Sequence, residues 1–180
     1  MQIIIRPRGF TLLEVLIALL VFSLGLLGMA GLLVISVKTN HSAYLRTQAS
    51  FLAQSMGDRM RANVPRVWAG DYDGTYTGTT GDTDPCPSGT ACSRTQIATR
   101  DKAQWETQLG DQLPNGQAII DCAPDGTVSV TPDEQAGGAP YTGICRIVMS
   151  WSEASLDRTQ DGAPANGNPQ LETFAWAFAP

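Results

Sequence analysis

A long run without charge near the amino terminus constrains this chain more than any other feature. From Val15 to Val37 the sequence contains no Asp, Glu, Lys or Arg. Such a run exceeds the roughly 20 apolar residues that cross a bilayer as a helix, so it predicts one membrane span. A secretory signal peptide would have a shorter apolar core, about 7 to 15 residues, that ends at a small-residue cleavage site. The remainder of the chain is therefore expected to lie outside the bilayer.

Helical periodicity continues beyond the span. Pro7 and Pro65 enclose a stretch without proline. Apolar side chains recur at helical spacing in its second half, at Leu45, Ala49, Leu52, Ala53, Met56 and Met60. One helix is expected from Phe10 to just before Pro65, since proline disfavours helical geometry at the residue that precedes it. Residues 10–37 would span the membrane and residues 38–64 would protrude from it.

The charges are unevenly distributed along the chain. The formal net charge is −5, and the acidic excess lies beyond Arg66. An acidic body argues against nucleic-acid binding, because affinity for a duplex comes chiefly from Lys and Arg that neutralise phosphates. The leader "MQIIIRPR" is basic and should remain cytoplasmic, which places the carboxyl-terminal body on the other side of the membrane.

The four cysteines are confined to this polar body. An even set predicts disulfides and an oxidising compartment. Zinc is the alternative, but no C-x-x-C pair occurs and the only histidine, His41, lies far upstream. Four cysteines permit three pairings. The expected one joins Cys86 to Cys92 across a short loop and Cys122 to Cys145 at the ends of two strands, provided that no strand separates the second pair.

Residues 69–90, "AGDYDGTYTGTTGDTDPCPSGT", are rich in turn formers and predict an irregular loop. The carboxylates in "DYDG" and "DTD" raise the question of calcium, but the spacing and the terminal glutamate of an EF-hand loop are absent. No metal and no cofactor is expected, although the sequence leaves a metal in this loop open.

The rest of the body predicts a helix and several strands. Asp101 suits a helix start, and Trp105, Leu109 and Leu113 form one apolar face. "QAIIDC" and "TVSV" flank the turn signal "APDG" and predict a hairpin, and "GICRIVMSW" and "QLETFAWAF" predict two more strands. Residues 65–180 should therefore form an α+β head, in which about four antiparallel strands pack on the exposed half of the long helix.

The leader ending in Gly9, followed by "FTLLEVLIALLVFSLGLLGMAGL", resembles the type III signal segment of type IV pilins and their secretion-system relatives. The resemblance implies the pilin fold and a leader, residues 1–9, that a prepilin peptidase removes after Gly9. It also implies methylation of the new amino terminus at Phe10. Glu14 becomes the acid five places into the mature chain. A carboxylate in hydrocarbon needs a partner, and the amino group of a neighbouring subunit is an available cation. The alternative is a first-turn acid that is favoured by the helix dipole or that snorkels to the headgroups.

The continuation resembles the PilV group of minor pilins, in the stretches Gly25–Leu32, Arg46–Ala49 and Asp58–Asn63. This resemblance implies a single-pass inner-membrane protein, with a cytoplasmic amino terminus and a periplasmic head, that passes into a pilus at the cell surface. Its role would be pilus assembly or initiation, and through the pilus twitching motility or adhesion. Implied partners are the prepilin peptidase, other minor pilins, the major pilin, the assembly platform, a large tip adhesin and inner-membrane lipid.

Other functions remain to be weighed against a minor pilin. A minor pseudopilin of a type II secretion system would share the leader, Glu14 and the fold. A DNA-uptake tip protein is disfavoured by the acidic composition. An enzyme is not expected, because no nucleophile has a base or metal set beside it in the sequence.

Overall fold

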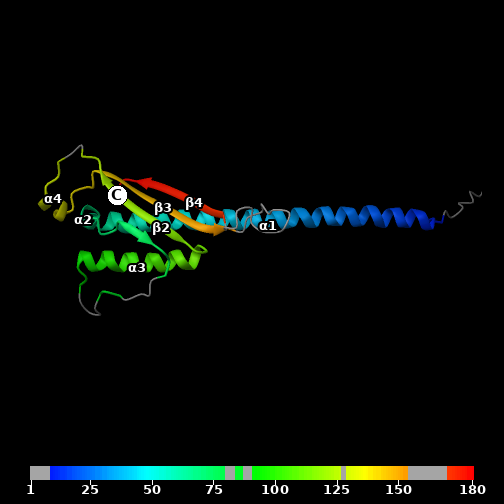
Figure 1. The fold of residues 1–180 in the computed structure, drawn as a ribbon, viewed down its shortest axis with the longest axis horizontal. Coiled ribbons are helices and arrows are strands. Elements are labelled where there is room, and N and C mark those ends of the chain that lie inside the picture. The colour runs from blue at the N-terminus through cyan, green and yellow to red at the C-terminus, as the bar shows by residue number, and fades with distance from the viewer. Residues whose placement is uncertain (1–8, 80–83, 87–90, 127–128, 154–169) are drawn as a thin grey trace, which may run out of the picture. The chain divides into compact units, whose positions relative to one another are not determined.

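The computed structural model describes residues 9–79, 84–86, 91–126, 129–153 and 170–180. The chain forms two compact units, residues 1–43 and 44–180. Figure 1 shows the elements, whose bounds are α1 (Leu12–Ala62), α2 (Val64–Trp68), β1 (Gly74–Tyr76), α3 (Arg94–Gln112), β2 (Gln117–Pro124), α4 (Pro132–Gly137), β3 (Gly143–Glu153) and β4 (Gln170–Phe178). The basic leader, residues 1–8, lies outside the described residues.

The first unit contains the apolar part of α1. Its residues 9–37 are all exposed, although most of them are apolar. The most apolar window of α1 has a mean hydropathy of 2.5, and none of that window is buried. The core helix of a soluble protein would bury such residues, whereas no part of the chain that the structure describes covers these. By length and composition α1 is thus a candidate membrane span.

The second unit begins within α1, and here the helix is amphipathic. The six apolar positions that the sequence predicts as its inner face, from Leu45 to Met60, are all buried. The helix ends at Ala62. The sequence indicated that helical structure stops before Pro65. Instead, Pro65 lies in the first turn of a second, short helix, α2. Proline is tolerated there, since a first-turn N–H has no intrahelical partner.

A four-stranded antiparallel sheet packs against this helix. The strands lie in the order β1-β2-β3-β4, so strands that follow one another in sequence are neighbours (Figure 1). Residues 145, 147, 149 and 151 of β3 are fully buried, and the intervening residues are not. On β4, Phe178 is buried and Phe174 and Trp176 are partly buried, whereas residues 171, 173, 175 and 177 are exposed. The long helix and the sheet confirm the predicted α+β fold.

Helix α3 begins earlier than predicted. Asp101 is not its first residue, because Ser93 caps the helix: the Ser93 side chain accepts from the Gln96 N–H, and the Gln96 side chain accepts from the Ser93 N–H. This reciprocal capping box satisfies two N–H groups that a helix end leaves free. The predicted apolar face is correct, since Trp105, Leu109 and Leu113 are fully buried. The Trp105 indole also donates to the Leu52 carbonyl of α1 at 2.8 Å.

The predicted hairpin between "QAIIDC" and "TVSV" is wrong. Strand β2 pairs with β1 and β3 instead. Ser129 and Val130 belong to no strand, and residues 127–128 lie outside the described residues. Directly afterwards Thr131 and Glu134 form a second capping box, which starts α4. The local preference for a helix start outweighs the β-propensity of four residues.

The missing fourth strand comes from the region predicted as an irregular loop. Within residues 69–90, Gly74–Tyr76 forms β1 at one edge of the sheet. Tyr76 anchors this strand, because its ring is buried and meets Trp105 edge-on at 5.3 Å between centroids. Residues 80–83 and 87–90 of the same region lie outside the described residues.

Candidate functional site

The junction between Gly9 and Phe10 lies just ahead of α1. Neither residue belongs to a helix or strand, and no atom lies within 4 Å of the position that a Cβ on Gly9 would take. The Phe10 side chain is 83% exposed. A protease needs an extended substrate that is not already engaged in helical hydrogen bonds. The peptide bond between Gly9 and Phe10 meets this requirement.

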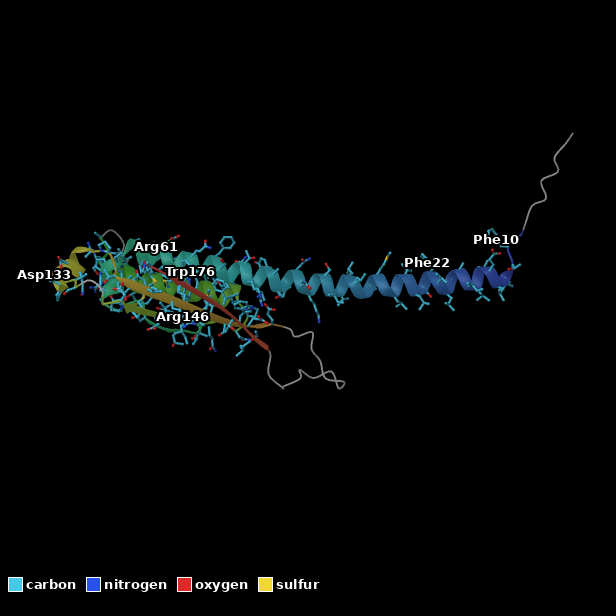
Figure 2. The ribbon with its side chains drawn as sticks, turned by 90° about the horizontal axis from the view of Figure 1, so that it is seen from above. Phe10, Phe22, Arg61, Asp133, Arg146 and Trp176 are labelled. Atoms are coloured by element: carbon cyan, nitrogen blue, oxygen red, sulfur yellow. A yellow bond between two sulfur atoms is a disulfide. The ribbon has the colours of Figure 1, made fainter. Side chains whose placement is uncertain are left out.

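Glu14 occupies the first turn of α1. Its backbone N–H donates to the Thr11 carbonyl at 3.1 Å and lies 3.3 Å from the Thr11 hydroxyl oxygen. These bonds fix the helix start and leave the carboxylate uninvolved. The surrounding surface is a shallow hollow of about 510 Å³, lined by Phe10, Glu14, Val15, Ala18, Leu19 and Phe22. Phe10 and Phe22 mark its two ends along α1 in Figure 2.

The hollow brings together two of the residues singled out in the sequence, Phe10 and Glu14. Among the described residues no Lys or Arg forms an ion pair with Glu14. A carboxylate in such apolar surroundings is costly unless a cation or hydrogen-bond donor reaches it. The described residues therefore supply no cation for the Glu14 carboxylate.

Comparison with known proteins finds a family motif in this segment. Residues 6–30 match the prokaryotic N-terminal methylation motif. The match includes Gly9, Phe10 and Glu14 and supports a protein of the type IV pilin or pseudopilin kind. The motif is the site recognised by prepilin peptidase, and with the long apolar helix it fits a pilin anchored in the inner membrane. It indicates a structural rather than a catalytic protein. No curated protein and no solved structure matches the chain.

The head offers a second set of polar contacts, at the carboxyl-terminal end of α1. Asp101 is 8% exposed and accepts from Arg59 at 3.3 Å and from the Tyr72 hydroxyl at 3.1 Å. The Asn63 amide donates to the Tyr72 oxygen at 3.3 Å and to the Arg94 carbonyl at 2.9 Å. Burial raises the pKa of Tyr72, and Asp101 adds to the rise while the Asn63 hydrogen bond opposes it. The network ties α1 to α3 and to the loop that precedes β1.

A cleft of about 540 Å³ opens beside this network, lined by Arg59, Arg61, Ala62, Asn63, Val64, Pro65, Arg94, Ile97, Asp101 and Gly138. Its arginines are already engaged. Arg59 pairs with Asp101, Arg61 pairs with Asp58, and Arg94 donates to the Ala136 carbonyl. The cleft thus consists of contacts that hold the fold. Sequence reasoning missed the role of Asp101 because the pairing depends on tertiary structure.

An ion pair links the helix to the last strand. Arg46 donates to the Glu172 carboxylate at 2.7 Å. Glu172 shares the inner face of β4 with Phe174, Trp176 and Phe178, and its charge there meets a cation on α1.

The cysteines form two disulfides, with the pairing expected from the sequence. Cys86 is bonded to Cys92 and Cys122 to Cys145. The second bond is unobstructed because β2 and β3 are direct neighbours and place Cys122 opposite Cys145. Among the described residues, no group of three or more His, Cys, Asp or Glu side chains is arranged to hold a metal ion.

Proposed function

We propose that this chain is a minor pilin, a structural subunit that is needed for the assembly or initiation of a type IV pilus. The observation that carries the proposal is the methylation motif over residues 6–30, on an apolar helix that exposes Glu14. Through the pilus the protein serves twitching motility or adhesion. Its task is binding to other subunits rather than catalysis.

The chemistry of assembly follows from Gly9, Phe10 and Glu14. Prepilin peptidase cleaves after Gly9 and methylates the amino group of Phe10. The cationic terminus of one subunit then meets the Glu14 carboxylate of its neighbour. In hydrocarbon such a pair attracts far more strongly than it does in water, because the low dielectric screens it little. Before assembly, residues 10–37 anchor the protein in the inner membrane with the head in the periplasm, where its disulfides persist.

The helix sequence supports a minor pilin of the PilV group. Two of the stretches that resemble this group have structural roles in the head: Arg46 pairs with Glu172, and Arg59 and Asn63 belong to the buried network around Asp101. Partners of such a subunit are other minor pilins, the major pilin, the assembly platform and a large tip adhesin.

A minor pseudopilin of a type II secretion system is the second candidate, because the methylation motif is common to both classes. Deletion of the gene distinguishes them. Loss of surface pili and of twitching supports the minor pilin, whereas loss of secreted enzymes with normal pili supports the pseudopilin.

Mass spectrometry of the unreduced native protein tests the processing. We expect an amino terminus at Phe10 that carries one methyl group, and two intact disulfides, in protein recovered both from membranes and from sheared pili. An amino terminus at Met1, or one within residues 18–30, contradicts the proposal. So does processed protein that is absent from sheared pili of cells that assemble them normally.

A further inference from the structure

Strand β4 forms one edge of the sheet, and the direction of its free backbone groups can be derived from the register. The Asp125 N–H donates to the Thr142 carbonyl, which marks this pair as hydrogen-bonded between the ends of β2 and β3. Hydrogen-bonded and non-bonded pairs alternate along an antiparallel ladder. The even-numbered residues of β3 therefore point their N–H and C=O groups toward β2, and its odd-numbered residues point them toward β4.

The disulfide gives an independent check. Cys122 lies opposite Cys145, and their Cα atoms are 4.0 Å apart. This separation matches a non-hydrogen-bonded pair, about 4.5 Å, rather than a hydrogen-bonded pair, about 5.5 Å. Cys145 therefore directs its backbone away from β2 and toward β4, as the parity requires.

On β4, the residues that lie opposite odd-numbered β3 residues use their backbone groups in the ladder. These include Phe174 opposite Met149 and Trp176 opposite Ile147. The intervening residues direct their N–H and C=O groups outward from the sheet: Leu171, Thr173, Ala175 and Ala177. Within the described residues, no hydrogen bond reaches these outward groups.

Natural proteins guard edge strands with lysine, proline, bulges or inward charges, because an open edge is a template for another strand. From Leu171 to Phe178 there is no lysine, proline or glycine. The only charge in that stretch, Glu172, is held by Arg46. The inner side chains Phe174 and Trp176 pack against the core but remain partly exposed. Apolar core surface thus continues out to the open edge.

We propose that the β4 edge from Leu171 to Ala177 receives an extended strand from another subunit of the same fibre, a step that rests on the minor pilin function. The outward N–H and C=O groups specify an extended backbone as the occupant. Partly exposed Phe174 and Trp176 call for apolar side chains on the inner face of that strand.

Arg61 lies at one end of the edge and is already paired with Asp58. Its side chain is 43% exposed, lies over the rings of Trp176 and Phe178 at 6.0 and 5.1 Å, and donates to the Ala179 carbonyl. Asp58, its carboxylate partner, is itself 76% exposed. Because Asp58 already neutralises Arg61, the incoming strand needs no charged residue here, and its residues along the edge are uncharged.

Photo-cross-linking in cells that assemble the fibre tests the geometry. A photoreactive phenylalanine analogue replaces Leu171, Thr173 or Ala177 in separate full-length chains, and Ile119, which is 54% exposed on the inner strand β2, serves as the control position. Strand pairing advances both chains residue by residue. We expect adducts to a single partner segment that shift by two residues for each two-residue step along β4, with no such series from Ile119.

Proline has no backbone N–H, so a proline on β4 removes a hydrogen-bond donor that the incoming strand needs. Because the Ala175 N–H points outward, Ala175→Pro leaves the ladder with β3 intact. We expect this variant to lose at least nine-tenths of the adduct from Thr173, and Ala175→Ser, which retains the N–H, to lose less than half. Membrane abundance and both disulfides report folding. Should Ala175→Pro fail to fold, Thr173→Pro replaces it, with the analogue at Ala177.

Three outcomes overturn the strand pairing. They are adducts with residues 154–169 of the same chain, adducts that join β4 of two copies, and adducts that Ala175→Pro leaves unchanged. Wild-type protein that is recovered in sheared pili without ordered adducts refutes the edge alone. If processed wild-type protein never enters pili, the minor pilin function itself is refuted.

Discussion

Replacing Gly57 tests the packing of α1 on the sheet. A Cβ at this buried glycine would lie 2.8 and 2.9 Å from the Cζ3 and Cη2 atoms of Trp176, and 3.4 Å from the Phe178 ring. Carbon atoms in contact prefer about 3.5 to 4.0 Å, so the indole must move by roughly 1 Å to admit even a methyl group. Its freedom is restricted, since it stacks on Phe178 at 4.4 Å between centroids and has Arg61 over its face.

Two opposing effects set the change in the free energy of unfolding that Gly57→Ala causes. An extra methyl group in a packed core costs about 1 to 3 kcal/mol. Alanine regains about 1 kcal/mol over glycine through helix propensity. We therefore expect Gly57→Ala to lower the free energy of unfolding of the head by about 1 kcal/mol. Gly57→Val adds bulk and gains less propensity, so it should cost about 2 to 3 kcal/mol.

The assay is thermal unfolding of the full chain in detergent, followed by near-ultraviolet circular dichroism. A loss of 1 kcal/mol lowers the Tm of a domain of this size by roughly 3 to 5 °C. Gly31→Ala is the matched control on the same helix, because nothing lies within 4 Å of its Cβ position. Trp176→Leu should reduce the cost of Gly57→Val. A Gly57→Val protein as stable as wild type would refute the close contact.

Three further predictions concern single interactions. Glu14→Ala should leave membrane abundance and cleavage unchanged but lower recovery in sheared pili at least tenfold, and equal recovery would leave Glu14 a first-turn acid. Burial raises the pKa of Tyr76 above its usual 10.0. The contribution of neutral Tyr76 to stability should therefore be fully present below about pH 10 and be lost as pH rises toward the native pKa. Tyr76→Phe should reduce the fall in Tm that wild type shows when thermal unfolding is measured at increasing alkaline pH. A double-mutant cycle on Arg46 and Glu172, whose side chains are 60% and 30% exposed, should give a coupling of about 0.5 kcal/mol that salt reduces. A value above about 2 kcal/mol would mean that the pair is shielded from water.

The sequence predicts best those elements whose periodicity is long. The inner face of α1 from Leu45 to Met60 repeats over several turns, and β4 alternates along nearly its whole length, so each pattern has one consistent interpretation. Short elements lack that redundancy. Gly74–Tyr76 is a strand only because β2 lies beside it and Tyr76 packs on Trp105.

Two predictions are wrong although the sequence contains the signals that contradict them. Ser93 with Gln96 and Thr131 with Glu134 are both capping boxes in the sequence, and each places a helix start that the apolar pattern had put elsewhere or had missed. At the candidate site, Gly9, Phe10 and Glu14 stand out through local sequence. The pairing of Asp101 with Arg59 and Tyr72 joins segments far apart in the chain, and no local pattern indicates it.

The contact between Gly57 and Trp176 also sets the order in which the head can be completed. Helix α1 is made early, but β4, the strand that covers this part of it, is the last of the described elements to be synthesised. At 5 to 20 residues per second, the ribosome needs about 6 to 24 s to proceed from Gly57 to Trp176. During that time the inner face of α1 lacks its last cover. The head therefore cannot close until β4 has been synthesised, and a chain that stops before β4 would leave both Gly57 and the edge of β3 bare.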